Sequence, residues 1–176
     1  MRYVALLRGI NVGGNTMIKM AELKESFAQL GFTNVVSYIN SGNLAFDRPK
    51  AGDEAVIVTK IEKALRKDFD RDIQVMVREQ TAITEVLANN PFDGEFESHK
   101  EMHVLFMKDK MPKEKQEQLL EYNRHNEKFA VRGREIYALL KLGVADSLLG
   151  KGFIEKKLKV PITARNWRTV EKIADL

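Results

Sequence analysis

Two short polar loops near the N-terminus hold the residue types best suited to binding chemistry. The first loop, Arg8–Asn15, follows the apolar run Tyr3–Leu7, and the second, Asn40–Asn43, connects two short β-rich runs. Glycine permits backbone angles that other residues resist, and asparagine, serine and arginine add hydrogen-bonding groups beside the backbone. A guanidinium together with backbone amides can surround the oxygens of a phosphate or a carboxylate. The two loops therefore predict an anion site if the fold brings them together.

The candidates for ligand contact come from these loops and from one C-terminal segment, whereas catalytic groups and cofactors stay unknown. They are Arg8, Gly9, Asn11, Gly13, Gly14, Ser41, Gly42, Asn43, Arg165 and Asn166. In the C-terminal segment, Arg165 can meet an anion at a helix N-terminus that Asn166 caps. Two structural readings stay open beside this one. The C-terminal pair can serve packing and capping alone, and the glycines and asparagines can only build tight turns.

Established catalytic motifs fit the sequence poorly. The segment 9–16 has the glycine spacing of a phosphate-binding G-x-x-x-x-G-K-[ST] loop, but Asn15 replaces the lysine that contacts the terminal phosphates. The histidines His99, His103 and His125 show no metal-ligand spacing, and the chain has no cysteine, so we predict no metal site. His103 lies in an apolar run and is interpreted as a satisfied strand residue.

Composition places the chain among ordinary globular proteins. The 176 residues are 44% hydrophobic and 31% charged, with a net charge of +4 that falls mainly in the second half. The first apolar run is too short for a signal peptide or a membrane span, so we expect a cytoplasmic protein with no membrane partner. The absence of cysteine excludes disulfides. The oligomeric state is not predicted.

Apolar periodicity predicts the order β-α-β-β-α-β in the first half, followed by one appended helix. The predicted strands are Val4–Leu7, Val35–Ile39, Leu44–Phe46 and Ile73–Val77. The first helix carries Met20 to Leu30 with Gly31 at its C-terminus, Asp53 caps the second helix, and Thr81 caps the appended one.

The second half repeats this order. Its predicted strands are Met102–Met107, Lys128–Val131, Ile136–Leu140 and Pro161–Ala164. Its predicted helices begin at Pro112, at Ser147 and, capped by Asn166, at Trp167. The two inner strands flank a second glycine hairpin, Arg132–Arg134.

The element order predicts an α+β fold of two tandem ferredoxin-like β-α-β-β-α-β units, each with an appended helix and an antiparallel sheet. The predicted domains are residues 1–90 and 101–176, joined by a linker at residues 91–100. In such a unit the third strand lies antiparallel between the first and the second. The end of the first strand and the turn between the second and third therefore lie at one edge. This topology predicts that Arg8–Asn15 and Asn40–Asn43 converge.

Binding of a small anionic or phosphate-bearing ligand is the leading hypothesis, and other functions stay open. A nucleic-acid-associated protein would use the basic C-terminal half, or would stack bases on Tyr3 and Phe46 as RNA-recognition modules do. An enzyme would need a distant carboxylate such as Asp47 or Glu79 as its base. A structural or partner-binding module would bind no ligand.

Four separated motifs together resemble the bacterial family named domain of unknown function 1697. They are Leu6–Gly14, Tyr38–Asn43, Asn90–Phe92 and Thr163–Val170, and the resemblance extends from Tyr3 to Ile173. It implies an α+β fold of two ferredoxin-like halves and no particular activity. Family members often carry lysine where this chain has Asn15, and a Ser-Lys-Leu segment where it has Ser147–Leu149.

Overall fold

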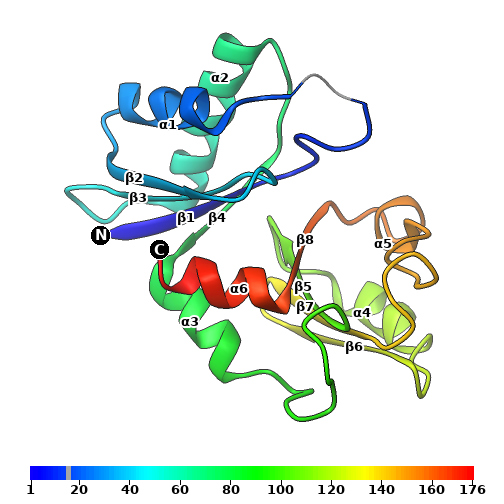
Figure 1. Ribbon diagram of the computed structural model, residues 1–176. Coiled ribbons are helices and arrows are strands. Elements are labelled where there is room, and N and C mark those ends of the chain that lie inside the picture. Colours follow the sequence, from blue (N-terminus) through cyan, green and yellow to red (C-terminus); the bar gives the residue numbers. More distant parts are fainter. Residues whose placement is uncertain (15–16) are drawn as a thin grey trace. The chain divides into compact units, whose positions relative to one another are not determined.

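The computed structural model describes residues 1–14 and 17–176 and contains two four-stranded antiparallel sheets (Figure 1). The chain forms two compact units. The first unit comprises Met1–Glu85 together with Lys172–Leu176, and the second comprises Val86–Glu171. The domains drawn from the sequence, residues 1–90 and 101–176 with a linker at residues 91–100, stay a prediction.

The first unit is built on a sheet with the strand order β2-β3-β1-β4, in which every neighbouring pair is antiparallel. Its elements, ending with the helix that leads into the second unit, are β1 (Arg2–Leu7), α1 (Met20–Gln29), β2 (Thr33–Tyr38), β3 (Asn43–Asp47), α2 (Glu54–Phe69), β4 (Val75–Glu79) and α3 (Gln80–Ala88). The central strand β1 pairs Ala5 with Leu44 of β3 and with Val77 of β4.

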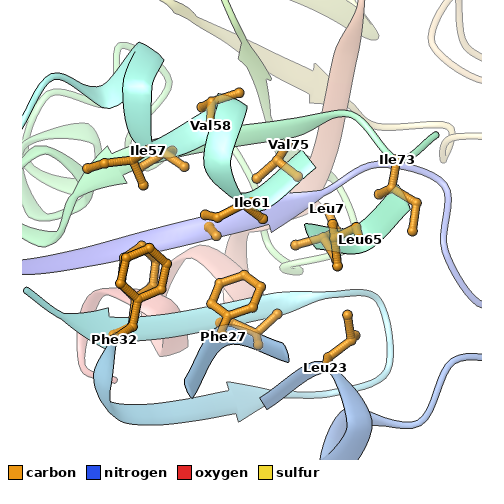
Figure 2. Packing of buried hydrophobic residues seen from close by; sticks show 14 of the residues in the cluster. Leu7, Leu23, Phe27, Phe32, Ile57, Val58, Ile61, Leu65, Ile73 and Val75 are labelled. Carbon is orange, nitrogen blue, oxygen red and sulfur yellow. The ribbon is translucent and has the colours of Figure 1, made fainter. Parts of the chain in front are cut away.

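The core of the first unit lies between one face of this sheet and the helices α1 and α2. Alternate residues of β1 belong to this core, namely Tyr3, Ala5 and Leu7. Figure 2 shows side chains of both helices gathered against the sheet. The rings of Phe32 and Phe46 stack with their centroids 4.3 Å apart. This packing fixes the position of β1 and hence of the loop that follows it.

The second unit repeats the arrangement with the strand order β6-β7-β5-β8. Its elements, ending with the helix that leads back to the first unit, are β5 (Met102–Met107), α4 (Lys113–Leu120), β6 (Glu127–Arg132), β7 (Glu135–Leu140), α5 (Phe153–Lys156), β8 (Ile162–Asn166) and α6 (Trp167–Ala174). Alternate residues of β5 again face a core, where Leu105 and Met107 are buried with Leu119 and Phe129. The expected α+β class, with two β-α-β-β-α-β units on antiparallel sheets, is therefore confirmed.

Three local predictions are wrong. The helix predicted from Ser147 is reduced to Phe153–Lys156. Ser147 closes a turn instead, because its hydroxyl donates to the Val144 carbonyl and accepts from the Gly150 amide. Gly150 permits this turn, since a Cβ at that position would clash with the Val144 carbonyl. Thr81 is no cap, since α3 already begins at Gln80. Ile39 lies outside β2, since its φ of 49° is incompatible with a strand.

The helices of the described residues include none long and apolar enough to cross a membrane. The predicted cap at Asp53 is confirmed, because its side chain accepts a hydrogen bond of 2.9 Å from the Ala55 amide. Gly31 directly follows the C-cap residue Leu30 of α1, at a φ of 82° that glycine adopts readily.

Candidate functional site

The two N-terminal loops meet at one edge of the first sheet, as the topology predicts. The Leu7 amide donates a hydrogen bond of 2.9 Å to the Gly42 carbonyl, which joins the end of β1 to the β2–β3 hairpin. A Cβ at Gly42 would lie 2.8 Å from both Leu7 Cβ and Ile10 Cδ1. Only glycine permits this approach. We call residues 8–14 with residues 39–43 the first corner.

Asn11 holds the two halves of the first corner together. Its side-chain amide donates to the carbonyls of Ile18 at 2.9 Å and Asn40 at 2.8 Å, and its Oδ1 accepts from the Ile18 amide at 2.7 Å. Asn11 adopts a φ of 54°, a left-handed conformation that asparagine tolerates better than most residues. The predicted ligand-binding residue Asn11 is thus engaged in fixing the loop to the hairpin.

Gln74 positions Arg8 at the base of the loop. The Arg8 amide donates to the Gln74 carbonyl at 2.9 Å, and Arg8 Nη1 donates to Gln74 Oε1 at 3.1 Å. This bond to the neutral Gln74 side chain orients the guanidinium. Arg8 itself is partly exposed. The cation of the first corner therefore has a defined place beside the loop.

Several residues of the loop after β1 adopt the left-handed backbone conformation. Gly9, Asn11 and Gly13 have φ of 66°, 54° and 56°, whereas Ile10 and Val12 between them lie outside the positive-φ region. Repeated left-handed residues in a short loop are typical of segments whose backbone N–H groups can meet an anion. Gly9, Gly13 and Gly14 are exposed. This geometry provides backbone donors beside a cation.

The hairpin contributes structure more than free polar groups. Asn43 is fully buried, and its Nδ2 donates at 3.0 Å to both the Tyr38 carbonyl and Ser41 Oγ. Gly42 is buried against the loop, and only Ser41 of the three is partly exposed. Of the hairpin candidates, Ser41 is thus the one whose side chain borders solvent. Asn15, which ends the predicted loop, lies outside the described residues.

Arg165 and Asn166 belong to the second unit, at the end of β8 away from the β6–β7 hairpin. Arg165 Nη1 donates to Thr163 Oγ1 at 2.7 Å and to the Ala164 carbonyl at 2.9 Å. Burial lowers the pKa of the Arg165 guanidinium to about 10. Asn166 Oδ1 accepts from the Thr169 amide at 2.9 Å, which confirms the capping interpretation of this residue.

Two alternative chemistries find no support in the geometry. Tyr3 and Phe46 are fully buried and stack on each other in the core, so neither ring can stack on a nucleotide base. Asp47 and Glu79 lie opposite Arg2 and Tyr3, at the end of the sheet away from the first corner. The hydrogen bond from Asn34, together with Arg2, lowers the pKa of Asp47. Neither carboxylate can serve as a base at the first corner.

The histidines form no metal centre. Within residues 1–14 and 17–176, no group of three or more histidines and carboxylates is placed to hold a metal ion. His103 lies in β5 as expected, but it is not satisfied, since its buried Nδ1 has no hydrogen-bond partner among the described residues. Burial lowers the pKa of His103 to about 4, and His99 adds to this effect.

Sequence reasoning missed Gln74 and the exposed apolar side chains Val12, Met17 and Ile39 of the same region. Gln74 precedes a strand that pairs with β1, so the pairing of β4 could have placed it beside Arg8. No sequence signal marks Ile39, because an isoleucine after a β-rich run favours strand continuation.

The equivalent corner of the second unit has a different chemistry. The Met107 amide donates to the Arg134 carbonyl at 2.9 Å, so the loop after β5 meets the β6–β7 hairpin. Four basic residues lie on these two segments, namely Lys108, Lys110, Arg132 and Arg134. We call these four residues the basic corner.

Comparison with known proteins gives a family and a structural relative. The family described as "Protein of unknown function (DUF1697)" matches residues 1–137. A solved structure, described as "The structure of conserved bacterial protein SP0830 from Streptococcus pneumoniae", is similar with 27% identity and a TM-score of 0.73. That similarity covers 99% of this chain and 97% of the other. No curated protein matches.

The repeated units and the glycine-loop corner thus define an α+β protein with a duplicated architecture and one distinctive sheet edge. The chain belongs to the family of proteins of unknown function DUF1697, as the four sequence motifs predict.

Proposed function

We propose that the first corner binds a small anionic or phosphate-bearing ligand. The left-handed backbone of Gly9, Asn11 and Gly13 in an exposed loop beside Arg8 is the observation that carries this proposal. Backbone N–H groups on one concave side complement the oxygens of an anion, and a guanidinium adds charge-assisted hydrogen bonds. The ligand itself would contact Arg8, Gly9, Gly13, Gly14 and Ser41.

Preorganisation supports the same proposal. Asn11 makes one hydrogen bond to the hairpin at Asn40 and two to Ile18, and Gln74 orients Arg8. A site whose donors are already fixed loses less conformational entropy on binding than a mobile one. Asn11, Gly42 and Asn43 would then support the site without touching the ligand.

A thermal-shift screen of inorganic phosphate, phosphorylated metabolites and nucleotides tests the proposal. A ligand present at a hundred times its Kd should stabilise the protein by about 2.7 kcal/mol. Arg8→Ala should remove this stabilisation. Lys63→Ala, which removes an exposed charge from α2, is the matched control and should retain it. Equal stabilisation of wild type and Arg8→Ala would reject the proposal.

The basic corner favours a second candidate function, which is contact with the phosphate backbone of nucleic acid. Four basic residues on one loop and one hairpin outnumber the acidic Asp109 and Glu135 of the same segments, and an excess of positive charge on one surface is typical of nucleic-acid binders. Binding of single strands through all four would give a slope of log K against log salt of about −3. Lys110→Gln combined with Arg132→Gln should roughly halve this slope, whereas the exposed Lys157→Gln should not. Absence of binding at low salt would remove this candidate.

A further inference from the structure

Three large apolar side chains in or next to the first corner face solvent. Val12 is 54% exposed, Met17 is 63% exposed and Ile39 is 50% exposed. Each lies one residue from the Asn11 hydrogen-bond network, since Val12 follows Asn11, Met17 precedes Ile18, and Ile39 precedes Asn40. These apolar residues therefore flank the hydrogen bonds of Asn11 that shape the proposed anion site.

Ile39 is held in a conformation that its side chain resists. Its φ of 49° lies in the left-handed region, where a β-branched residue is a genuine outlier. The other described non-glycine residues with positive φ are Asn11, Asn34, Asp70 and Lys159, none of which is β-branched. Because half of Ile39 is exposed, core packing does not account for an isoleucine at this position. Strained residues of this kind gather at binding sites.

The charge of the first corner limits the kind of ligand. In residues 8–14 and 39–43, Arg8 is the only lysine or arginine. Attraction to an anionic membrane surface uses clusters of four to eight basic residues. A single cation beside an exposed glycine loop instead matches one anionic head group. The apolar side chains around it match an uncharged body attached to that head.

We infer that the first corner takes a small anion with an apolar body, bound by its phosphate or carboxylate head at the glycine loop and by its body on Val12, Met17 and Ile39. This inference rests on the proposed function and adds the chemical class of the ligand. The apolar contacts would remove side-chain surface from water, which is favourable for each buried methylene.

NMR titration of the full-length protein with inorganic, methyl, propyl and hexyl phosphate tests the inference. Affinity should rise with chain length by up to about fourfold per buried methylene, and by at least about tenfold from methyl to hexyl phosphate. Val12→Ser and Ile39→Asn should reduce the advantage of hexyl phosphate and leave the affinity for inorganic phosphate unchanged. The control is Val56→Ser on α2, which replaces a valine that is 58% exposed. It should change neither affinity.

Ile39→Asn separates a binding role from a structural one. Asparagine tolerates positive φ, so this variant should melt at a higher temperature than wild type while binding hexyl phosphate less tightly. Affinity independent of chain length would overturn the inference and leave the proposed function intact, provided that phosphate binding still requires Arg8. Phosphate binding unaffected by Arg8→Ala would instead count against the proposed function. Binding to phosphatidylglycerol vesicles through the same residues would overturn the choice of a small ligand.

Discussion

At the scale of single residues, Asn11 shows how one side chain can determine the shape of a loop. Its amide satisfies two carbonyls and one N–H from segments on either side, and its backbone adopts a conformation that alanine resists. Because the Ile18 and Asn40 groups would otherwise need other partners, the loop and the hairpin depend on this residue for their mutual position.

Replacing Asn11 should therefore destabilise the first unit. Asn11→Ala removes three hydrogen bonds, each with a net contribution of about 1 kcal/mol, and places alanine in the left-handed region. We expect a loss of about 2 to 4 kcal/mol in the free energy of unfolding, measured by urea denaturation. Asn11→Asp keeps the acceptor for the Ile18 amide but turns a carboxylate oxygen toward the Ile18 and Asn40 carbonyls, so it should destabilise the unit as well. A loss below about 0.5 kcal/mol for Asn11→Ala, the level of an ordinary surface substitution, would contradict this role.

The residue types in the sequence predicted that the first corner is rich in hydrogen-bonding groups. They did not predict which of these groups bond within the protein. Asn11 and Asn43 were candidates for ligand contact, and both direct their amides into the protein. Arg8 and Gly13 were placed by the same reasoning and do border the exposed loop. The difference arises because the partners of a side-chain amide depend on tertiary contacts, which a single sequence does not reveal.

At the scale of elements, the approach of the β2–β3 hairpin to the loop after β1 depends on Gly42. Gly42 and Gly31 have nearly the same φ, 86° and 82°, but a Cβ at Gly31 has no described atom within 4 Å. Gly42→Ala adds contacts of 2.8 Å to the same backbone strain. It should therefore destabilise the protein by at least about 1 kcal/mol more than Gly31→Ala. Thermal unfolding of the two variants checks this difference, and equal costs would show that the hairpin can move away.

The start of α6 offers a separate test, since Asn166 caps this helix. Asn166→Ala leaves the Thr169 amide without its side-chain acceptor and should cost about 1 kcal/mol of stability. Asn166→Asp retains the acceptor and should stay near wild type. Denaturant midpoints measure both effects. Loss of stability in Asn166→Asp as large as in Asn166→Ala would argue against the cap.

Periodicity predicted the order of the elements well because each buried strand and amphipathic helix leaves a clear apolar pattern. Strand ends were less predictable, and β4 is shifted from the predicted Ile73–Val77 to Val75–Glu79. The predicted helix from Ser147 fails for a local reason, since its apolar residues are present but Gly150 allows a tight turn. The convergence of the two loops was predictable because it follows from strand order alone.

At the scale of the whole molecule, the two units share a buried arginine at the same position, although their sequences are barely alike. Arg78 is buried opposite Val4 in β4, and Arg165 is buried opposite Val104 in β8. Each donates from Nη1 to the carbonyl of the preceding residue at 2.9 Å. The two arginines occupy matching register positions, each followed by one residue and then a helix. Sequence reasoning did not detect this pair, because identity between the halves is slight.

At a second pair of equivalent positions the two units carry different residues. This difference leads to a prediction of how stability depends on pH. Tyr3 of β1 and His103 of β5 occupy equivalent positions, and both belong to faces that are buried. Tyr3 has a polar partner, since its hydroxyl accepts from the Gly52 amide at 3.1 Å. Among the described residues, His103 Nδ1 has none. Burial of the imidazole, with His99 nearby, disfavours its charged form and lowers the pKa of His103 from 6.5 to about 4.

Acidification should consequently destabilise the protein in the range between these two pKa values. Below pH 6.5 the unfolded chain binds a proton at His103 that the folded chain does not, so the free energy of unfolding decreases as the pH falls. Between pH 7.5 and pH 5 we expect a loss of about 2 kcal/mol, measured by urea denaturation. The carboxyl groups Asp47 and Glu101, whose pKa values are lowered, contribute mainly at lower pH. His103→Gln should flatten this dependence, whereas His125→Gln, at an exposed position, should leave it unchanged. A slope that persists in His103→Gln would show that the buried imidazole is not its source.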